Sequence, residues 1–302
     1  MSINISIVAD DDYKERIRIN ASTFHKNFSA GDFEKNGPLV TENVYVNSNN
    51  AILIGRENFV NRIQRYKTPF PGLQMKDRIV LVDGNVASVH YILQGNQRGP
   101  YGQIAASGNK VEAMSAEFFV MNQDAIMTNL LTITQLDKLE VQSRGEQKVE
   151  SFQAVDLLPV KEHAPAFKQK IKDAIDHYLG YFNARKWDEL EKMISNSVKI
   201  NWNSSLESGK EAFLINLKER MIGIPDLTYQ IDRNVVDGDR AGIAYTMIGK
   251  HTGMLKANGT FLPPSEKTVS VREGQYLQFD AEGKITSVIT VSNANDFITQ
   301  LR

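Results

Sequence analysis

The last strand that the sequence predicts ends on a residue suited to ligand binding. The stretch GKITSVITVSNAND, Gly283 to Asp296, reads as a tight turn and an alternating strand that closes on Asn293. A side-chain amide donates and accepts hydrogen bonds, but it neither takes nor gives a proton at neutral pH. Asn293 therefore indicates binding, and the strand leaves open whether the chain is a catalyst.

Two similar strands carry further polar candidates. They are VYVNSN, residues 44–49, and VKINWN, residues 198–203. Asparagine is disfavoured in strands, so these amides indicate hydrogen bonds either to a ligand or to a neighbouring loop. The aromatic residues of these strands and of a third strand either line a pocket or fill the core. The candidates of this group are Tyr45, Asn47, Asn201, Trp202 and Tyr245.

One histidine lies in the middle of a predicted strand. His90, next to Tyr91, either titrates near neutral pH in a pocket or has a structural role. The five histidines are scattered and the chain has no cysteine, so no metal-binding pattern is formed. Phosphate-binding and dinucleotide-binding glycine motifs are also absent from the sequence. We therefore expect neither a metal nor a cofactor.

Composition narrows the class of protein. The chain has 302 residues, 41% apolar and 24% charged, which suits two globular domains of about 150 residues each. The net charge of −1 gives no basic field for nucleic acid or an anionic membrane. Neither a signal peptide nor a run of 18 apolar residues is present, so we expect a cytoplasmic protein without a membrane span.

The sequence is an internal duplication. Val44 aligns with Val198, a shift of 154 positions, and this register holds without a gap as far as Gly99 and Gly253. Four extra residues then change the shift to 158, which aligns Ser107 with Ser265. A single register held this long indicates a tandem repeat. The expected domains are copy one at 1–141, a linker at 142–166, and copy two at 167–302.

Each copy has the same predicted order of elements. Apolar residues at helical spacing open each copy, and a short second helix, the asparagine strand and a third helix follow. Proline ends the third helix, and Asp-Gly turns connect the later strands. Helices followed by an antiparallel meander predict an α+β domain.

Several short motifs resemble one known family. Copy two contains IPDL, DGDRAGIAYTMIGKHTG, LPPSEKTVSV and FDAEGKI, and copy one keeps looser versions such as FPGL and ASGNKVEA. In order and spacing they resemble the signatures of the SnoaL-like, or polyketide-cyclase-like, branch of the nuclear-transport-factor-2-like superfamily. The resemblance covers nearly the whole chain outside the linker.

The resemblance implies two cone-shaped domains, each a curved, mostly antiparallel sheet wrapped on about three helices. It implies an apolar pocket at the mouth of each cone and pairing through the outer faces of the sheets. A tandem chain would make that pairing internally, as a pseudo-dimer. The family's cyclases carry a catalytic aspartate on the last strand, and that position is Asn293 in copy two and Gln135 in copy one.

Other groups could supply the missing acid. Counting back from a pairing of Phe279 with Ile285 places Gln275 opposite Ile289, and the same count places Glu117 opposite Leu131. Glu117 is then a carboxylate inside the cone, where desolvation would raise its pKa, or else an outward, solvated residue. His251 matches a histidine of the family's pattern and is either a ligand or a surface residue.

Two functions fit these observations. In the first, the chain binds a small, largely apolar molecule and transforms it by cyclisation, isomerisation or hydrolysis, with Glu117 and His251 as candidate catalytic residues. In the second, it is a non-catalytic ligand-binding or assembly module. We expect the better-formed pocket in copy two, because copy two keeps more of the family's motifs.

Overall fold

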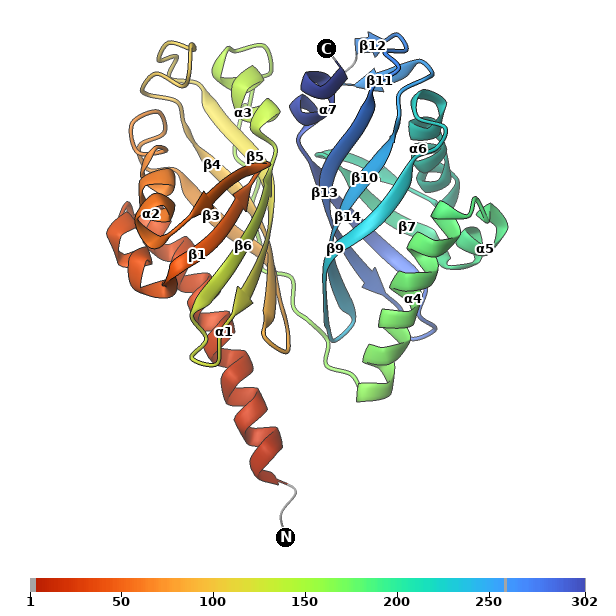
Figure 1. Cartoon of the computed structure of the whole chain (residues 1–302), viewed down its shortest axis with the longest axis horizontal. Helices are drawn as coiled ribbons and strands as arrows, with labels where there is room; N and C mark the ends of the chain where they lie inside the picture. Colours follow the sequence, from red (N-terminus) through yellow and green to blue (C-terminus); the bar gives the residue numbers. More distant parts are fainter. Residues whose placement is uncertain (1–3, 258–259, 302) are drawn as a thin grey trace. The chain divides into compact units, whose positions relative to one another are not determined.

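The computed structural model describes residues 4–257 and 260–301, with side chains for 11–256 and 261–301 (Figure 1). The chain divides into two compact units, Met1–Pro159 and Val160–Arg302, which contain copy one and copy two. The division falls within the predicted linker. Inside that linker, the backbone N–H of Leu158 donates to the carbonyl of Arg78, so this residue contacts β3 (Gln74–Asp83) of copy one.

Each copy contains a six-stranded sheet with the same topology. The orders are β2-β1-β6-β5-β4-β3 and β8-β7-β14-β13-β10-β9. Among the described strands, only the pairs β1–β6 and β7–β14 are parallel, so the mostly antiparallel α+β architecture is confirmed. The strands of copy one are β1 (Val40–Ser48), β2 (Ala51–Ile54), β3 (Gln74–Asp83), β4 (Val86–Asn96), β5 (Lys110–Met121) and β6 (Met127–Thr134). Those of copy two are β7 (Ile194–Trp202), β8 (Ser205–Ser208), β9 (Thr228–Asp237), β10 (Arg240–Lys250), β13 (Thr268–Phe279) and β14 (Ile285–Ser292), with a separate hairpin of β11 (Leu255–Ala257) and β12 (Thr260–Leu262).

Helices cover one face of each sheet (Figure 1). The helices of copy one are α1 (Asn4–Ala30), the 3₁₀ helix η1 (Phe33–Leu39), α2 (Arg56–Gln64) and α3 (Leu136–Ser143). Those of copy two are α4 (Pro165–Asn183), α5 (Trp187–Lys192), α6 (Lys210–Gly223) and α7 (Ala294–Leu301). The sequence predicted three helices per copy and missed the one after the last strand. Helices α3 and α7 span only 8 residues each, too few to show a clear period.

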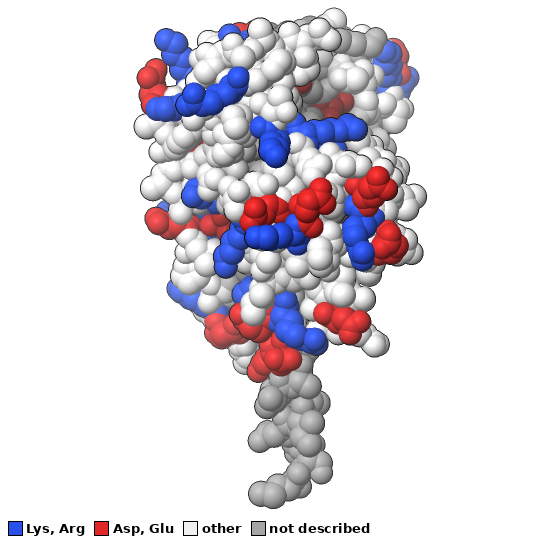
Figure 2. Space-filling model, turned by 90° about the vertical axis from the view of Figure 1, so that its left-hand side faces the viewer, with Lys and Arg blue, Asp and Glu red and all other residues white. Residues whose placement is uncertain are grey.

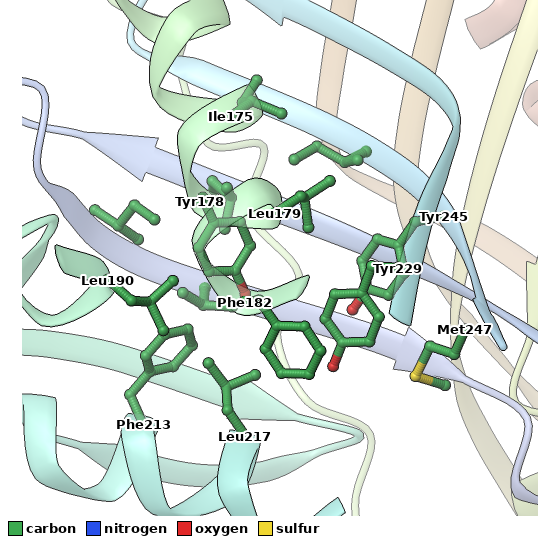
Figure 3. Packing of buried hydrophobic residues seen from close by; sticks show 14 of the residues in the cluster. Ile175, Tyr178, Leu179, Phe182, Leu190, Phe213, Leu217, Tyr229, Tyr245 and Met247 are labelled. Atoms are coloured by element: carbon green, nitrogen blue, oxygen red, sulfur yellow. The ribbon is translucent and has the colours of Figure 1, made fainter. Parts of the chain in front are cut away.

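The core of copy two shows how helix and sheet meet. Helix α4 opens with Pro165, which suits a first helical position, and buries Ile175, Tyr178 and Phe182 at helical spacing. The ring of Phe182 stacks on Tyr229 of β9, with centroids 4.0 Å apart, and Tyr229 stacks on Tyr245 of β10 (Figure 3). These contacts fix the inner face of the sheet against α4.

A β-bulge in the last hairpin of each copy changes the predicted register. Phe279 pairs with Ile285 as expected, but Gln278 pairs with Ser287, so Thr286 is an extra residue. The matching bulge in copy one lies at Thr128. Our count ignored this residue and was therefore one position wrong: Gln275 faces Thr290, and Glu117 faces Thr132.

Charged side chains of both signs are interspersed on the surface of copy one. Figure 2 shows acidic and basic residues alternating over the face that it displays. No helix in the described part of the chain is long and apolar enough to cross a bilayer.

Candidate functional site

A cavity of about 230 Å³ opens in copy two between the sheet, α6 and α7. Both apolar and polar side chains line it. The lining residues of this cavity are Trp202, Asn203, Asn216, Glu219, Arg220, Ile224, Leu227, Leu255, Lys256, Glu273, Ser292, Ala294 and Phe297. Such a mixture is typical of a small-molecule site.

Glu273 is the buried carboxylate of this cavity. It lies on β13, directly opposite Tyr245 of β10 and Ser292 of β14, so all three share the inner face. The carboxylate is 1% exposed. Its Oε2 accepts hydrogen bonds from Arg220 Nη1 at 2.7 Å and from the Tyr245 hydroxyl at 2.8 Å. Its Oε1 is buried and accepts no hydrogen bond from the described residues.

Arg220 of α6 is held by three neighbours. Its guanidinium lies 4.0 Å from the ring centroid of Trp202, and Nη1 also contacts the sulfur of Met247 at 2.9 Å. Burial by itself lowers the pKa of Arg220, but Glu273 more than offsets this and raises the pKa above its ordinary value. Arg220 therefore stays cationic and neutralises one oxygen of Glu273.

Tyr245 keeps its proton in this site. Burial raises its pKa well above the usual value, and the charge of Glu273 raises it further. The hydroxyl is thus a hydrogen-bond donor to Glu273 across the ordinary pH range. The hydroxyl, the carboxylate and the guanidinium form a charge-balanced group of three, in which one carboxylate oxygen has no partner among the described residues.

Copy one contains a different cluster of buried charges. His25 of α1 lies between two carboxylates: its Nδ1 bonds to Asp77 of β3, and its Nε2 lies 2.9 Å from Oε2 of Glu117 on β5. Oε1 of Glu117 accepts from the hydroxyls of Tyr91 at 3.0 Å and Thr132 at 3.1 Å. Both oxygens of Glu117 are therefore occupied by the protein itself.

His25 is an imidazolium at neutral pH. Complete burial lowers its pKa, but Asp77 and then Glu117 more than reverse this, and the pKa rises to about 9. Both ring nitrogens consequently donate. The cavity beside Glu117 has only about 40 Å³, against about 230 Å³ for the cavity of copy two. This cluster is packed rather than open.

Glu117 and Gln275, the two strand candidates from the hairpin count, face inward. Gln275 is fully buried and its Nε2 donates to Thr290, as Glu117 accepts from Thr132 in copy one. Tyr91 and Tyr245 also face inward and bond the carboxylates of their own copies. The structure thus brings Tyr91 and Glu117 into contact in copy one, whereas Tyr245 and Gln275 bond different partners in copy two.

The last-strand amides lie elsewhere. Asn293 precedes α7, and its Nδ2 donates to Asp296 in the first turn of that helix at 2.9 Å. Gln135 precedes α3 and accepts from the backbone N–H of Met114 at 2.9 Å. Neither residue lines either of the two cavities described above, whereas Ser292 and Thr134, one position earlier, do. The bulge accounts for this shift by one position.

Three further candidates face away from the cavities. Val46 and Ile200 are core residues of β1 and β7, so their neighbours Tyr45, Asn47 and Asn201 point to the opposite face. Oδ1 of Asn201 accepts from the backbone N–H of Ser204 in the following turn. Of the asparagine and aromatic candidates on β1 and β7, only Trp202 lines the cavity of copy two.

His251 and His90 have structural contacts. His251 is buried and its Nδ1 lies 3.1 Å from Oγ of Ser265; in copy one, the equivalent Gln97 contacts the equivalent Ser107. Both side chains therefore stabilise the same loop. Nδ1 of His90 lies 2.9 Å from the carbonyl oxygen of Ser115, and burial lowers the pKa of His90 to about 4.

The sequence analysis missed four charged residues of the two sites: His25, Asp77, Arg220 and Glu273. A signal for one of them was present. Glu273 lies two residues before Gln275 on an alternating strand, so it shares the inward face of Gln275. Arg220 and His25 come from helices whose orientation against the sheet could not be counted from the strands. Among the described residues, no group of histidine and carboxylate side chains is arranged to hold a metal ion.

The family profile described as SnoaL-like polyketide cyclase matches residues 19–140 and 172–301. The chain belongs to this family. The two matches repeat the duplication seen in sequence and structure, and each copy of this SnoaL-like protein is one family unit. None of the curated proteins matches the sequence.

Solved structures resemble one copy at a time. AclR from Streptomyces galilaeus has 17% identity, covers 46% of this chain and 97% of its own, and has a TM-score of 0.39. TsrD from Streptomyces laurentii has 21% identity, covers 46% of this chain and 98% of its own, and has a TM-score of 0.40. IdmH from Streptomyces antibioticus has 18% identity, covers 43% of this chain and 97% of its own, and has a TM-score of 0.39.

Proposed function

We propose that copy two binds a small, largely apolar organic molecule and catalyses a proton transfer on it, of the kind that isomerisation or ring closure requires. Glu273 is the proposed general base. The observation that carries the proposal is that Glu273 lines the cavity while its buried Oε1 accepts no hydrogen bond from the described residues.

The neighbours of Glu273 fit this role. Arg220 and Tyr245 both bond Oε2, so they hold the carboxylate in place and leave Oε1 without a partner among the described residues. A base fixed in this way loses little orientation freedom when the substrate arrives. Phe297 and Leu227 supply apolar walls that hold the body of the molecule.

Copy one is assigned a framework role by the same reasoning. Both oxygens of Glu117 are engaged by His25, Tyr91 and Thr132, and the adjoining cavity is about 40 Å³. Glu117 therefore presents no oxygen to a substrate. Sheet-to-sheet pairing of the two copies, expected from the sequence, stays a prediction.

The test compares two matched variants on a panel of cyclic ketones, esters and epoxides. Glu273→Gln keeps the size of the side chain and removes the base, so we expect turnover to fall by at least about 100-fold. Glu117→Gln is the matched control in the other copy and should retain the wild-type rate. Equal loss in both variants, or none in either, would contradict the assignment of Glu273.

A further inference from the structure

The cavity of copy two contains four charged side chains whose charges cancel. Arg220 and Lys256 are basic, and Glu219 and Glu273 are acidic. An arginine in a cavity ordinarily favours an anionic ligand, because its guanidinium matches a carboxylate or phosphate. Here that attraction is already satisfied inside the protein, since Arg220 lies 2.7 Å from Glu273.

The buried polar atom of the cavity that still lacks a partner among the described residues is an acceptor, so a ligand would have to supply a hydrogen-bond donor. Oε1 of Glu273 is buried and accepts no hydrogen bond from the described residues, and an unsatisfied buried acceptor is unfavourable. A ligand hydroxyl or N–H would satisfy it. A ligand carboxylate would instead meet a carboxylate of the same charge at short range.

The volume limits the ligand to a small molecule. A cavity of about 150 Å³ lined by apolar side chains is known to hold one benzene ring. The cavity of about 230 Å³ here accommodates one ring with a few substituents. Its walls include Trp202, Leu227 and Phe297, which suit the faces and edges of such a ring.

We propose that the ligand of copy two is a neutral, single-ring molecule that carries a hydroxyl or N–H donor, bound by donation to Oε1 of Glu273, and that the site discriminates against the matching carboxylates. This inference rests on the proposed function and specifies the substrate class of the same site. The selectivity comes from Glu273 itself, because it attracts a donor and repels an anion.

Trp202 provides a signal for the test. The chain has two tryptophans, so Trp187→Phe leaves Trp202, which lines the cavity, as the remaining indole. Its fluorescence is titrated with phenol and with benzoate, which share a ring and differ in the donor and the charge. We expect phenol to bind at least about tenfold more tightly, a difference of about 1.4 kcal/mol.

Two variants in the Trp187→Phe background sharpen the result. Glu273→Gln removes the negative charge and should reduce the preference for phenol to less than about threefold, whereas Glu117→Gln in copy one should leave it unchanged. Tighter binding of benzoate than of phenol would overturn the inference while leaving a small-molecule site in copy two. A preference that survives in Glu273→Gln would also overturn it. If neither probe changed the Trp202 signal, the proposed function itself would fail with it.

Discussion

The two copies share a frame but place their buried charges differently. Copy one has a cation between two carboxylates, and copy two has a single ion pair one pleat away along the equivalent strand. Under the sequence register, the positions of His25, Asp77 and Glu117 hold uncharged residues in copy two: Leu179, Ile231 and Gln275. Conversely, Arg220 and Glu273 correspond to Tyr66 and Ser115 in copy one.

This difference teaches that buried charged residues differ between the copies as whole groups of opposite charges, rather than one residue at a time. A carboxylate left in a core without its cation carries a large desolvation penalty, whereas an uncharged set of similar size does not. The position opposite the last-strand threonine is Glu117 in one copy and Gln275 in the other, and each bonds that threonine. The fold therefore tolerates either set, provided that it is complete.

The largest expected effect comes from breaking the set in copy one. His25→Leu installs the residue of copy two but leaves Glu117 and Asp77 without their cation, so we expect a loss of about 3–5 kcal/mol in the free energy of unfolding. Adding Asp77→Ile and Glu117→Gln completes the exchange and should restore most of it.

Urea unfolding measures both variants. Both tryptophans, Trp187 and Trp202, lie in copy two, so fluorescence follows copy two while circular dichroism follows the whole chain. A triple variant no more stable than His25→Leu would show that the sets are not independent units.

The pH dependence of stability is the second way to separate the copies. The pKa of His25 rises from 6.5 to about 9 on folding, so its contribution is complete below pH 6.5 and is lost as the pH rises toward 9. The loss for copy one should be about 3 kcal/mol. His90, with its pKa lowered to about 4, acts in the opposite direction and only below pH 6.5.

Denaturant midpoints at intervals between pH 6 and 10 test this expectation. The triple variant, which lacks His25, should lose the alkaline decline. A decline of the same size in the triple variant would assign the effect to other groups.

The smallest expected effect concerns His251, whose place is taken by Gln97 in copy one. His251 and Gln97 hold equivalent loops through Ser265 and Ser107, so His251→Gln should change stability by less than about 0.5 kcal/mol. His251→Ala removes the contact and should be unfavourable by about 1 kcal/mol. Thermal unfolding of the two variants distinguishes a loop contact from a ligand role. A loop contact changes the stability of His251→Ala, whereas a ligand role would reduce ligand binding in both variants without changing stability.

The fold was predictable because its signals are repeated. Phe28 with Phe182 and Gly99 with Gly253 hold one register across two copies, and the motifs follow in the family's order. The candidate site was predictable only in part. Trp202 and Tyr245 were named as residues that either line a pocket or fill the core, and the strands alone did not decide between the two. Arg220, which lies over Trp202, comes from a helix, whose rotation depends on packing that strand counting does not include.

The register error has a local cause. Alternation places residues on the correct face only while every residue is paired, and a single bulged residue reverses the faces beyond it. Because of Thr286, the inward position near the end of β14 is Ser292 rather than Asn293. The sequence contains no glycine at Thr286 that would have indicated the bulge.

The two copies share the threonine of the bulge, but they do not share the charged residues around it. Oγ1 of Thr128 donates to the carbonyl of Val120, and Oγ1 of Thr286 makes the same contact with Gln278. Both copies have this hydroxyl contact, whereas the charged residues around it differ between the copies. An engineer could therefore exchange one complete set of acids and bases for the other in either half, as long as the two threonines that set the phase of the last strand are left in place.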